Sequence, residues 1–223
     1  MSKILFIVTA ARTWTLSDGT AHPTGYWAEE LLTPYRLLTD AGHDVRFATP
    51  GGVAPMVDEA SFDDASGAER SALAAIAGLA DPLSLDDVDV SSYDAAFYPG
   101  GHGPMEDLAQ DATSGAIITQ FLDEGKPLAL VCHGVAALLA SRRSDGTLTA
   151  AGRRVTAFTD EEETQAGLAA RAPWLLESTL RAGGIVLENA EPWADHVVVD
   201  GNLVTGQNPQ SSASVATKLR EQL

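Results

Sequence analysis

A single cysteine stands in the stretch LALVCHGVAALL, residues 128–139, and His133 follows it directly. Four apolar residues precede Cys132 and a second apolar run follows Gly134, so the pattern predicts a buried strand that turns sharply into a helix at the cysteine. Such an elbow places a nucleophile near the N–H groups of a helix N-terminus, where we expect the helix dipole to lower the pKa of the thiol. A small core residue is the alternative role for a buried free cysteine. The adjacent histidine favours chemistry.

Glycines and acids follow other predicted strands. The turn PGGHG, residues 99–103, lets the backbone approach a ligand closely and could present N–H donors to a developing oxyanion, although a plain tight turn is equally compatible with it. The acids DEEE, residues 160–163, precede a predicted helix, where they also suit the helix dipole. Glu29 and Glu30 lie in the first predicted helix; one of them facing Cys132 would place a carboxyl beside a thiol, which suits proton transfer.

A catalytic metal is the competing interpretation of these residues. The sequence has five histidines and no H-E-x-x-H motif, and there is no second cysteine to complete a thiolate site. Three ligands could still meet in space, but nothing in their spacing requires it. We therefore expect no metal. The histidines stand at positions 22, 43, 102, 133 and 196.

The elements that must position these residues alternate along the chain. Strands are predicted at 3–10, 44–50, 95–99, 127–131 and 153–159, and a hairpin in HVVVDGNLVTG around Asp200-Gly201-Asn202. Helices are predicted at 26–42, 71–80, 115–125, from Cys132 to residue 146, and in SSASVATKLREQL at the C-terminal end. Residues 12–25 are predicted to form a polar loop, and residues 51–70 to be irregular. This alternation predicts one α/β domain over residues 1–223 with a mostly parallel sheet. Sites in such sheets form at the carboxyl ends of the strands, where the residues described above are expected to meet.

Composition narrows the classes of function. The net charge of −17 argues against nucleic acid and anionic membrane surfaces as partners. No apolar run approaches the roughly 20 residues that span a bilayer. A lone cysteine forms no internal disulfide, and the short apolar start fits a buried first strand better than a signal peptide. We therefore expect a cytoplasmic protein.

Five stretches, in this order, carry a resemblance that covers nearly the whole chain. They are SDGTAHPTGYWAEELLTPY, AAFYPGGHGPMEDL, LALVCHGVAALL, VTAFTDEEE and PWADHVVVDGNLVTGQNPQSS. The sequence resembles the DJ-1/ThiJ/PfpI superfamily, which shares its fold with class I glutamine amidotransferases, and within it the Hsp31-like branch of glutathione-independent glyoxalases (glyoxalase III). The resemblance implies a flavodoxin-like, doubly wound, mostly parallel sheet sandwiched by helices, with a nucleophile elbow and a C-terminal β-hairpin. It also implies a homodimer.

The resemblance implies roles for particular residues. Cys132 matches the nucleophile, His133 the acid/base, and Glu163 the acid of a T-D-x-x-E stretch, although Asp160, Glu161 and Glu162 are neighbouring alternatives as the partner of His133. Glu30 matches a glutamate that hydrogen-bonds the nucleophile. The N–H groups of Gly101 and His133 match the oxyanion hole.

The implied reaction converts a small 2-oxoaldehyde such as methylglyoxal to lactate. Cys132 would form a hemithioacetal, Glu30 or His133 would move its proton, and hydrolysis would release the acid, so neither nicotinamide nor glutathione is required. A cysteine-dependent amidohydrolase, deglycase or peptidase could use the same nucleophile and oxyanion hole. An Hsp31-like holdase chaperone, or a redox sensor built on a readily oxidised thiol, is the third class.

Overall fold

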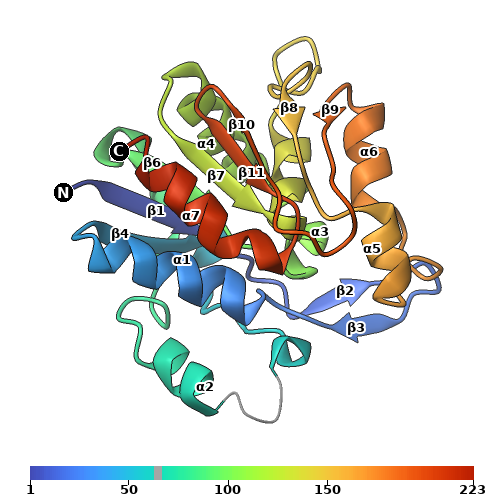
Figure 1. Ribbon diagram of the computed structural model, residues 1–223, viewed down its shortest axis with the longest axis horizontal. Coiled ribbons are helices and arrows are strands. Elements are labelled where there is room, and N and C mark those ends of the chain that lie inside the picture. The colour runs from blue at the N-terminus through green and yellow to red at the C-terminus, as the bar shows by residue number, and fades with distance from the viewer. Residues whose placement is uncertain (63–66) are drawn as a thin grey trace.

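The computed structural model describes residues 1–62 and 67–223. In these residues seven strands form one central sheet, in the order β10-β11-β7-β6-β1-β4-β5 (Figure 1). All neighbouring pairs are parallel except the β10–β11 hairpin at one edge. The predicted α/β class and the C-terminal hairpin are therefore confirmed.

The bounds of the elements are as follows. The central sheet consists of β1 (Lys3–Ile7), β4 (Asp44–Thr49), β5 (Leu83–Ser84), β6 (Ala95–Tyr98), β7 (Leu128–Val131), β10 (Val197–Asp200) and β11 (Leu203–Gly206). Two small sheets pair β2 (Thr13–Thr15) with β3 (Ala21–Pro23), and β8 (Arg154–Val155) with β9 (Val186–Leu187). The α-helices are α1 (Ala28–Asp40), α2 (Gly67–Ala74), α3 (Gly103–Glu106), α4 (Ala112–Asp123), α5 (Asp160–Gln165), α6 (Leu176–Ala182) and α7 (Ser212–Arg220). Turns of 3₁₀ helix occur at Pro50–Gly52, Glu59–Ser61, Leu85–Asp87, Val90–Ser92, Cys132–Ala140 and Pro209–Ser211.

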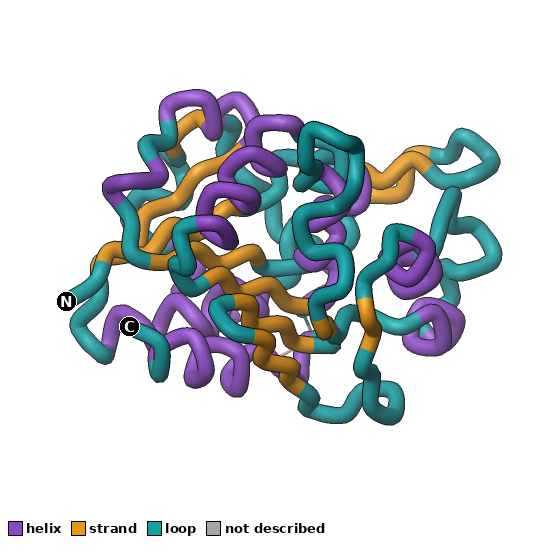
Figure 2. Tube along the Cα trace, turned by 90° about the horizontal axis from the view of Figure 1, so that it is seen from above, coloured by secondary structure: helices purple, strands orange, loops and turns teal. Residues whose placement is uncertain are grey.

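The core lies on both faces of the central strands. Every residue of β6 and β7 is buried, which is why these strands are continuous apolar runs without alternation. Phe6 of β1 pairs in register with Phe97 of β6, and their rings stack with centroids 4.8 Å apart. Helices α1 and α7 pack together on one side of the sheet, while α4 and the 3₁₀ helix after β7 lie on the other (Figures 1 and 2). The carboxyl ends of β1, β6 and β7 are thereby aligned at one edge.

Three predicted elements differ from the structure. The strand expected at 153–159 is regular only over β8. Beyond β8, Thr156 forms hydrogen bonds with side chains instead of continuing the backbone hydrogen bonds of a sheet, and its N–H donates to Thr205 Oγ1 at 2.9 Å. The helix expected at 71–80 spans Gly67–Ala74, and Gly78 at φ 82° lies beyond its end. The helix after Cys132 is 3₁₀ and ends at Ala140.

Two predicted segments are more ordered than expected. The polar loop at 12–25 contains the β2–β3 hairpin. The irregular segment 51–70 contains short 3₁₀ turns and the start of α2, and its residues 63–66 lie outside the described part of the chain. Among the residues that are described, no helix is both long and apolar enough to cross a membrane.

Candidate active site at the Cys132 elbow

Cys132 stands at a strained turn between β7 and the following 3₁₀ helix. Its φ of 56° lies in the left-handed region that non-glycine residues rarely adopt, and such strain is concentrated at functional sites. Neighbouring glycines allow the turn to sit tightly against β6: a Cβ at Gly134 would lie 2.5 Å from the carbonyl oxygen of Tyr98, and one at Gly100 would lie 2.9 Å from Cβ of Cys132. The predicted elbow is thus present, and its packing explains the glycines on both sides.

His133 links the cysteine to a buried carboxylate. Nδ1 of His133 lies 3.4 Å from Sγ of Cys132, and Nε2 lies 2.7 Å from Oε2 of Glu163. Burial lowers the pKa of His133, and the neighbouring His102 lowers it further. Burial opposes ionisation of Glu163, but its contacts with His133 and His102 outweigh that effect and hold its pKa below the ordinary range. At neutral pH the pair is therefore a neutral imidazole on an ionised carboxylate.

The first turn of α5 decides which acid reaches His133. Thr159 and Glu162 form a capping box, which directs Glu162 back toward the helix start, where it also accepts from the N–H of Trp193 and from Asn208 Nδ2. Glu161 is exposed, and Asp160 accepts from Ser178. Only the next position, Glu163, is brought against the imidazole, so the helix geometry resolves the choice that the sequence left open.

Glu30 of α1 lies on the other side of the cysteine. The N–H of Gly100 donates to its Oε2 at 2.7 Å, while Oε1 is buried without a partner of ordinary hydrogen-bond geometry among the described residues. The side chain is fully buried, and burial raises its pKa to about 8. At neutral pH the carboxyl therefore carries a proton. Because Oε2 accepts from Gly100, that proton belongs on Oε1, and the thiol of Cys132 is a hydrogen-bonding neighbour of the same carboxyl group.

The expected low thiol pKa is wrong for this structure. Burial raises the pKa of Cys132, and the charge that Glu30 carries above its own pKa of about 8 adds to the rise, whereas the N–H of His133 opposes it only in part. The residue is 3% exposed, so the effect of desolvation on the thiol pKa outweighs that of the dipole of a short 3₁₀ helix. The resting cysteine is a thiol, and its proton must leave as the sulfur attacks.

No specific role for His102 was predicted from the sequence, but the structure brings it into this cluster. Its Nε2 lies 2.9 Å from Oε1 of Glu163, so His102 and His133 share one carboxylate. These three are the one group of potential metal ligands among the described residues. Two ligands of a tetrahedral metal lie about 3.3 Å apart when each is bound at about 2.0 Å. The separations of 2.7 and 2.9 Å fit direct hydrogen bonds instead. The signal in the sequence was the histidine of PGGHG, which is weak by itself.

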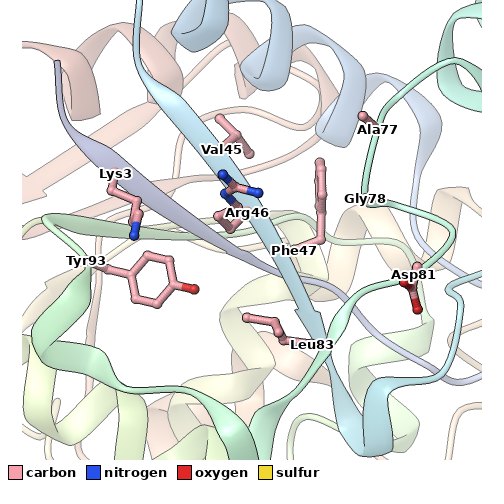
Figure 3. Close-up of a pocket in the computed structure, with 9 residues that line it drawn as sticks. All are labelled: Lys3, Val45, Arg46, Phe47, Ala77, Gly78, Asp81, Leu83 and Tyr93. Atoms are coloured by element: carbon pink, nitrogen blue, oxygen red, sulfur yellow. The ribbon is translucent and has the colours of Figure 1, made fainter.

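A small cavity opens onto the sulfur. Its volume is about 70 Å³, and its walls include Trp27, Gly101, His102, Cys132, His133, Phe158, Ala166, Trp193 and Pro209. The main chain at Gly101 has φ 89°, and a Cβ there would lie 2.5 Å from the carbonyl oxygen of Gly25, so glycine is required where this backbone lines the cavity. A larger cavity of about 380 Å³ lies against β1, β4 and β5, and the side chains of Lys3, Arg46 and Tyr93 are among those that line it (Figure 3). Neither cysteine nor histidine lines it.

The fold and the elbow define a class of α/β proteins with a cysteine at the carboxyl edge of a parallel sheet. The chain belongs to the DJ-1/PfpI family, which it matches over residues 23–222. This confirms the predicted superfamily.

Two curated relatives and one solved structure show how far the similarity extends. Glutamine amidotransferase-like class 1 domain-containing protein 1 of Bos taurus is 32% identical over 182 residues, covering 82% of this chain and 81% of that protein. Glyoxalase 3 of Candida albicans is 26% identical over 230 residues, covering 97% and 96%. The structure of rapid encystment protein 24 kDa of Francisella tularensis matches with a TM-score of 0.90 at 27% identity, covering 100% and 99%.

Proposed function

We propose that this protein is a glutathione-independent glyoxalase that converts a small 2-oxoaldehyde to the 2-hydroxy acid. The observation that carries the proposal is a cysteine set between two buried proton carriers, His133 and Glu30, whose pKa values are displaced in opposite directions. Such displaced pairs mark the acid and the base of a site. Moving hydrogen between two adjacent carbons requires both. The relative named glyoxalase 3 supports this choice.

The first step is addition of sulfur to the aldehyde. Nδ1 of the neutral His133 accepts the thiol proton while Sγ attacks, and the imidazolium returns that proton to the alkoxide, giving a hemithioacetal. The N–H groups of Gly101 and His133 are the proposed donors to the developing oxyanion. The neutral carboxyl of Glu30 donates toward the sulfur whenever the sulfur carries negative charge, which occurs at addition and at product release.

The second step moves hydrogen from C1 to C2. His133 removes the C1 proton and the C2 oxygen gains one, which gives an enediol. Protonation at C2 and loss of the proton on the C1 oxygen then give a 2-hydroxyacyl thioester, with Glu30 as the second proton carrier. C1 is oxidised and C2 is reduced, so no external oxidant or reductant enters. Water hydrolyses the thioester, and methylglyoxal becomes lactate.

Glu163 completes the proposed triad by holding His133 in the productive tautomer. An ionised carboxylate only accepts hydrogen bonds, so Nε2 of His133 must carry the hydrogen and Nδ1 must present its lone pair to the thiol. Such a carboxylate also stabilises the imidazolium as it forms.

The cavity favours a substrate of a few heavy atoms. Its volume of about 70 Å³ is far below the roughly 300 Å³ at which pockets for drug-sized ligands begin. Trp27, Phe158 and Trp193 give it apolar walls that suit a methyl group and exclude bulk water. The proposal also includes one domain over residues 1–223, a homodimer and a cytoplasmic location.

The test is turnover of methylglyoxal without glutathione, performed in D₂O and followed by proton NMR. Wild type is expected to form lactate that carries deuterium at C2, because the proton carriers exchange with solvent. Cys132→Ser and Glu30→Gln are expected to lose at least about 100-fold in kcat. Equal lactate formation by Cys132→Ser and wild type would refute the proposal.

An amidohydrolase is the second candidate, because the bovine relative is named as amidotransferase-like. Hydrolysis of an amide needs the nucleophile and the oxyanion hole but no hydrogen transfer between carbons. Release of ammonia from glutamine, or of acid from glycated peptides, by wild type and not by Cys132→Ser, with no lactate from methylglyoxal, would favour it. Equal suppression of aggregation by both proteins, without turnover, would instead favour a holdase; oxidation of Cys132 by mild peroxide, without turnover, would favour a redox sensor.

A further inference from the structure

His102 is held in one orientation by Trp14, His133 and Glu163. Its side chain is 11% exposed and its ring stacks on Trp14 of β2, with centroids 4.9 Å apart and an interplanar angle of 18°. The other neighbour is His133, whose ring centroid lies 4.2 Å away. Trp14 is itself buried, and its strand is tied to α3 because the N–H and Oγ1 of Thr15 both donate to Glu106. The β2–β3 hairpin thus fixes the plane of the imidazole.

The hydrogen bonds of Glu163 fix the tautomers of both rings. The carboxylate accepts from His102 on Oε1 and from His133 on Oε2, one imidazole for each oxygen. Because an ionised carboxylate only accepts, both Nε2 atoms carry hydrogen. A carboxylate with one partner rotates readily about its last torsion, which has a broad, roughly two-fold profile. Binding both oxygens removes that freedom.

Sharing the carboxylate also changes how it acts on His133. Part of its acceptor strength is used by His102, so the carboxylate stabilises an imidazolium at His133 less than it would alone. The like-charge interaction with His102 lowers the pKa of His133, which opposes protonation of that ring. The other titratable groups that face the two rings are Glu162 of α5 and, around the sulfur, Cys132 and Glu30.

We propose that His102 is a positioning residue that holds Glu163 against His133. In this role it also keeps His133 in its neutral, basic form down to lower pH values than His133 would reach without it. The proposal deepens the proposed glyoxalase function and rests on it. His102 acts through Glu163, and the Trp14 stack acts through His102. Through this stack, the β2–β3 hairpin helps to set the pH range over which His133 acts as a base.

Two variants distinguish the hydrogen bond that His102 donates from the space that its ring fills. His102→Phe keeps a ring against Trp14 and removes the donor to Glu163. His102→Gln restores an N–H donor and has no titratable group. The control His43→Gln removes an imidazole just before β4, at the edge of the sheet where the parallel strands begin and not at the carboxyl edge that holds the elbow. All are compared with wild type in kcat/KM for methylglyoxal from pH 5 to 9.

We expect His102→Phe to lose about 10-fold in kcat/KM at pH 7.5 and to move the midpoint of the acid limb upward by about half a pH unit or more. His102→Gln is expected to regain most of the loss at pH 7.5 and to keep an upward shift of the midpoint. His43→Gln should behave as wild type. A uniform loss in both variants with an unmoved acid limb would overturn the proposal, because a purely structural role predicts it.

NMR titration of the imidazole Cε1–H signals supplies a readout that does not depend on turnover. The pKa of His133 is expected to rise in both His102 variants. If wild type lacks glyoxalase activity but the His133 titration shifts, the proposed function fails and the positioning role stands. If wild type is active and neither the titration nor the acid limb shifts, the positioning role fails alone. Should His102→Phe not fold, His102→Gln decides by the same two measurements.

Discussion

Replacing Glu30 with glutamine is expected to stabilise the protein at alkaline pH and to leave its stability nearly unchanged at pH 5. Folding raises the pKa of this carboxyl from 4.5 to about 8 because burial disfavours its charged form. Between these values the folded protein holds a proton that the unfolded chain has released, so the free energy of unfolding falls as pH rises. The slope is about 1.4 kcal/mol per pH unit, and the total above pH 8 is about 5 kcal/mol.

The amide of Glu30→Gln avoids this cost because it never ionises. Its oxygen can accept from the N–H of Gly100 as Oε2 does now, and its NH₂ group can face the thiol. The difference from wild type should therefore grow steadily between pH 5 and pH 8. In a chain of this size it corresponds to a gain of about 10 °C or more in Tm at pH 8.5.

Urea unfolding at half-unit pH steps measures this difference directly. Glu161→Gln is the matched control, since it removes an exposed carboxyl from α5, and its difference from wild type should stay within about 0.5 kcal/mol at every pH. A difference between Glu30→Gln and wild type that is the same at pH 5 and pH 8.5 would refute the protonated Glu30 on which the proposed mechanism depends.

Three further predictions concern the same site. Alkylation of Cys132 by iodoacetamide should keep accelerating past pH 9, because burial raises the thiol pKa, and Glu30→Gln should move the profile to lower pH; a plateau by pH 7 would contradict the assignment of a resting thiol. Trp193→Ala should raise kcat/KM for phenylglyoxal relative to methylglyoxal by about 10-fold, since the indole forms a wall of the small cavity beside Phe158; an unchanged ratio in steady-state assays would show that the wall does not limit substrate size. Glu163→Gln should lower kcat by about 10²–10⁴-fold with little change in KM, because an amide cannot accept from both imidazoles; a loss confined to KM would assign Glu163 to substrate binding.

Local pattern was enough to predict the elements that carry the nucleophile. The apolar run before Cys132 indicated a strand buried on both faces, and β7 is fully buried. The apolar pattern was less informative at 153–159. There Thr156 forms hydrogen bonds with side chains of β11 and of the loop after β9 instead of with the backbone of a neighbouring strand. Such partners are distant in sequence, so periodicity carries no signal of them.

The electrostatics of the site were less predictable than its geometry. The position of Cys132 at a helix start suggested a low thiol pKa, but burial and the carboxyl of Glu30 act in the opposite direction. Both effects depend on how closely α1 approaches the elbow. That approach is set by Gly25, where a Cβ would lie 2.0 Å from the carbonyl oxygen of Met56, and by the N–H of Trp27, which donates to the carbonyl of Gly100 at 3.0 Å.

A protonated resting site has a consequence for selectivity. A free thiolate in the cavity would react with any small electrophile or oxidant that enters. Here the sulfur becomes nucleophilic only as its proton passes to His133, and the proton returns to the oxygen of the captured aldehyde. An electrophile that creates no alkoxide leaves the imidazolium charged between Glu163 and His102, in surroundings that disfavour that charge. The raised thiol pKa and the lowered imidazole pKa therefore act together, because each slows attack on an electrophile that creates no alkoxide to take up the proton.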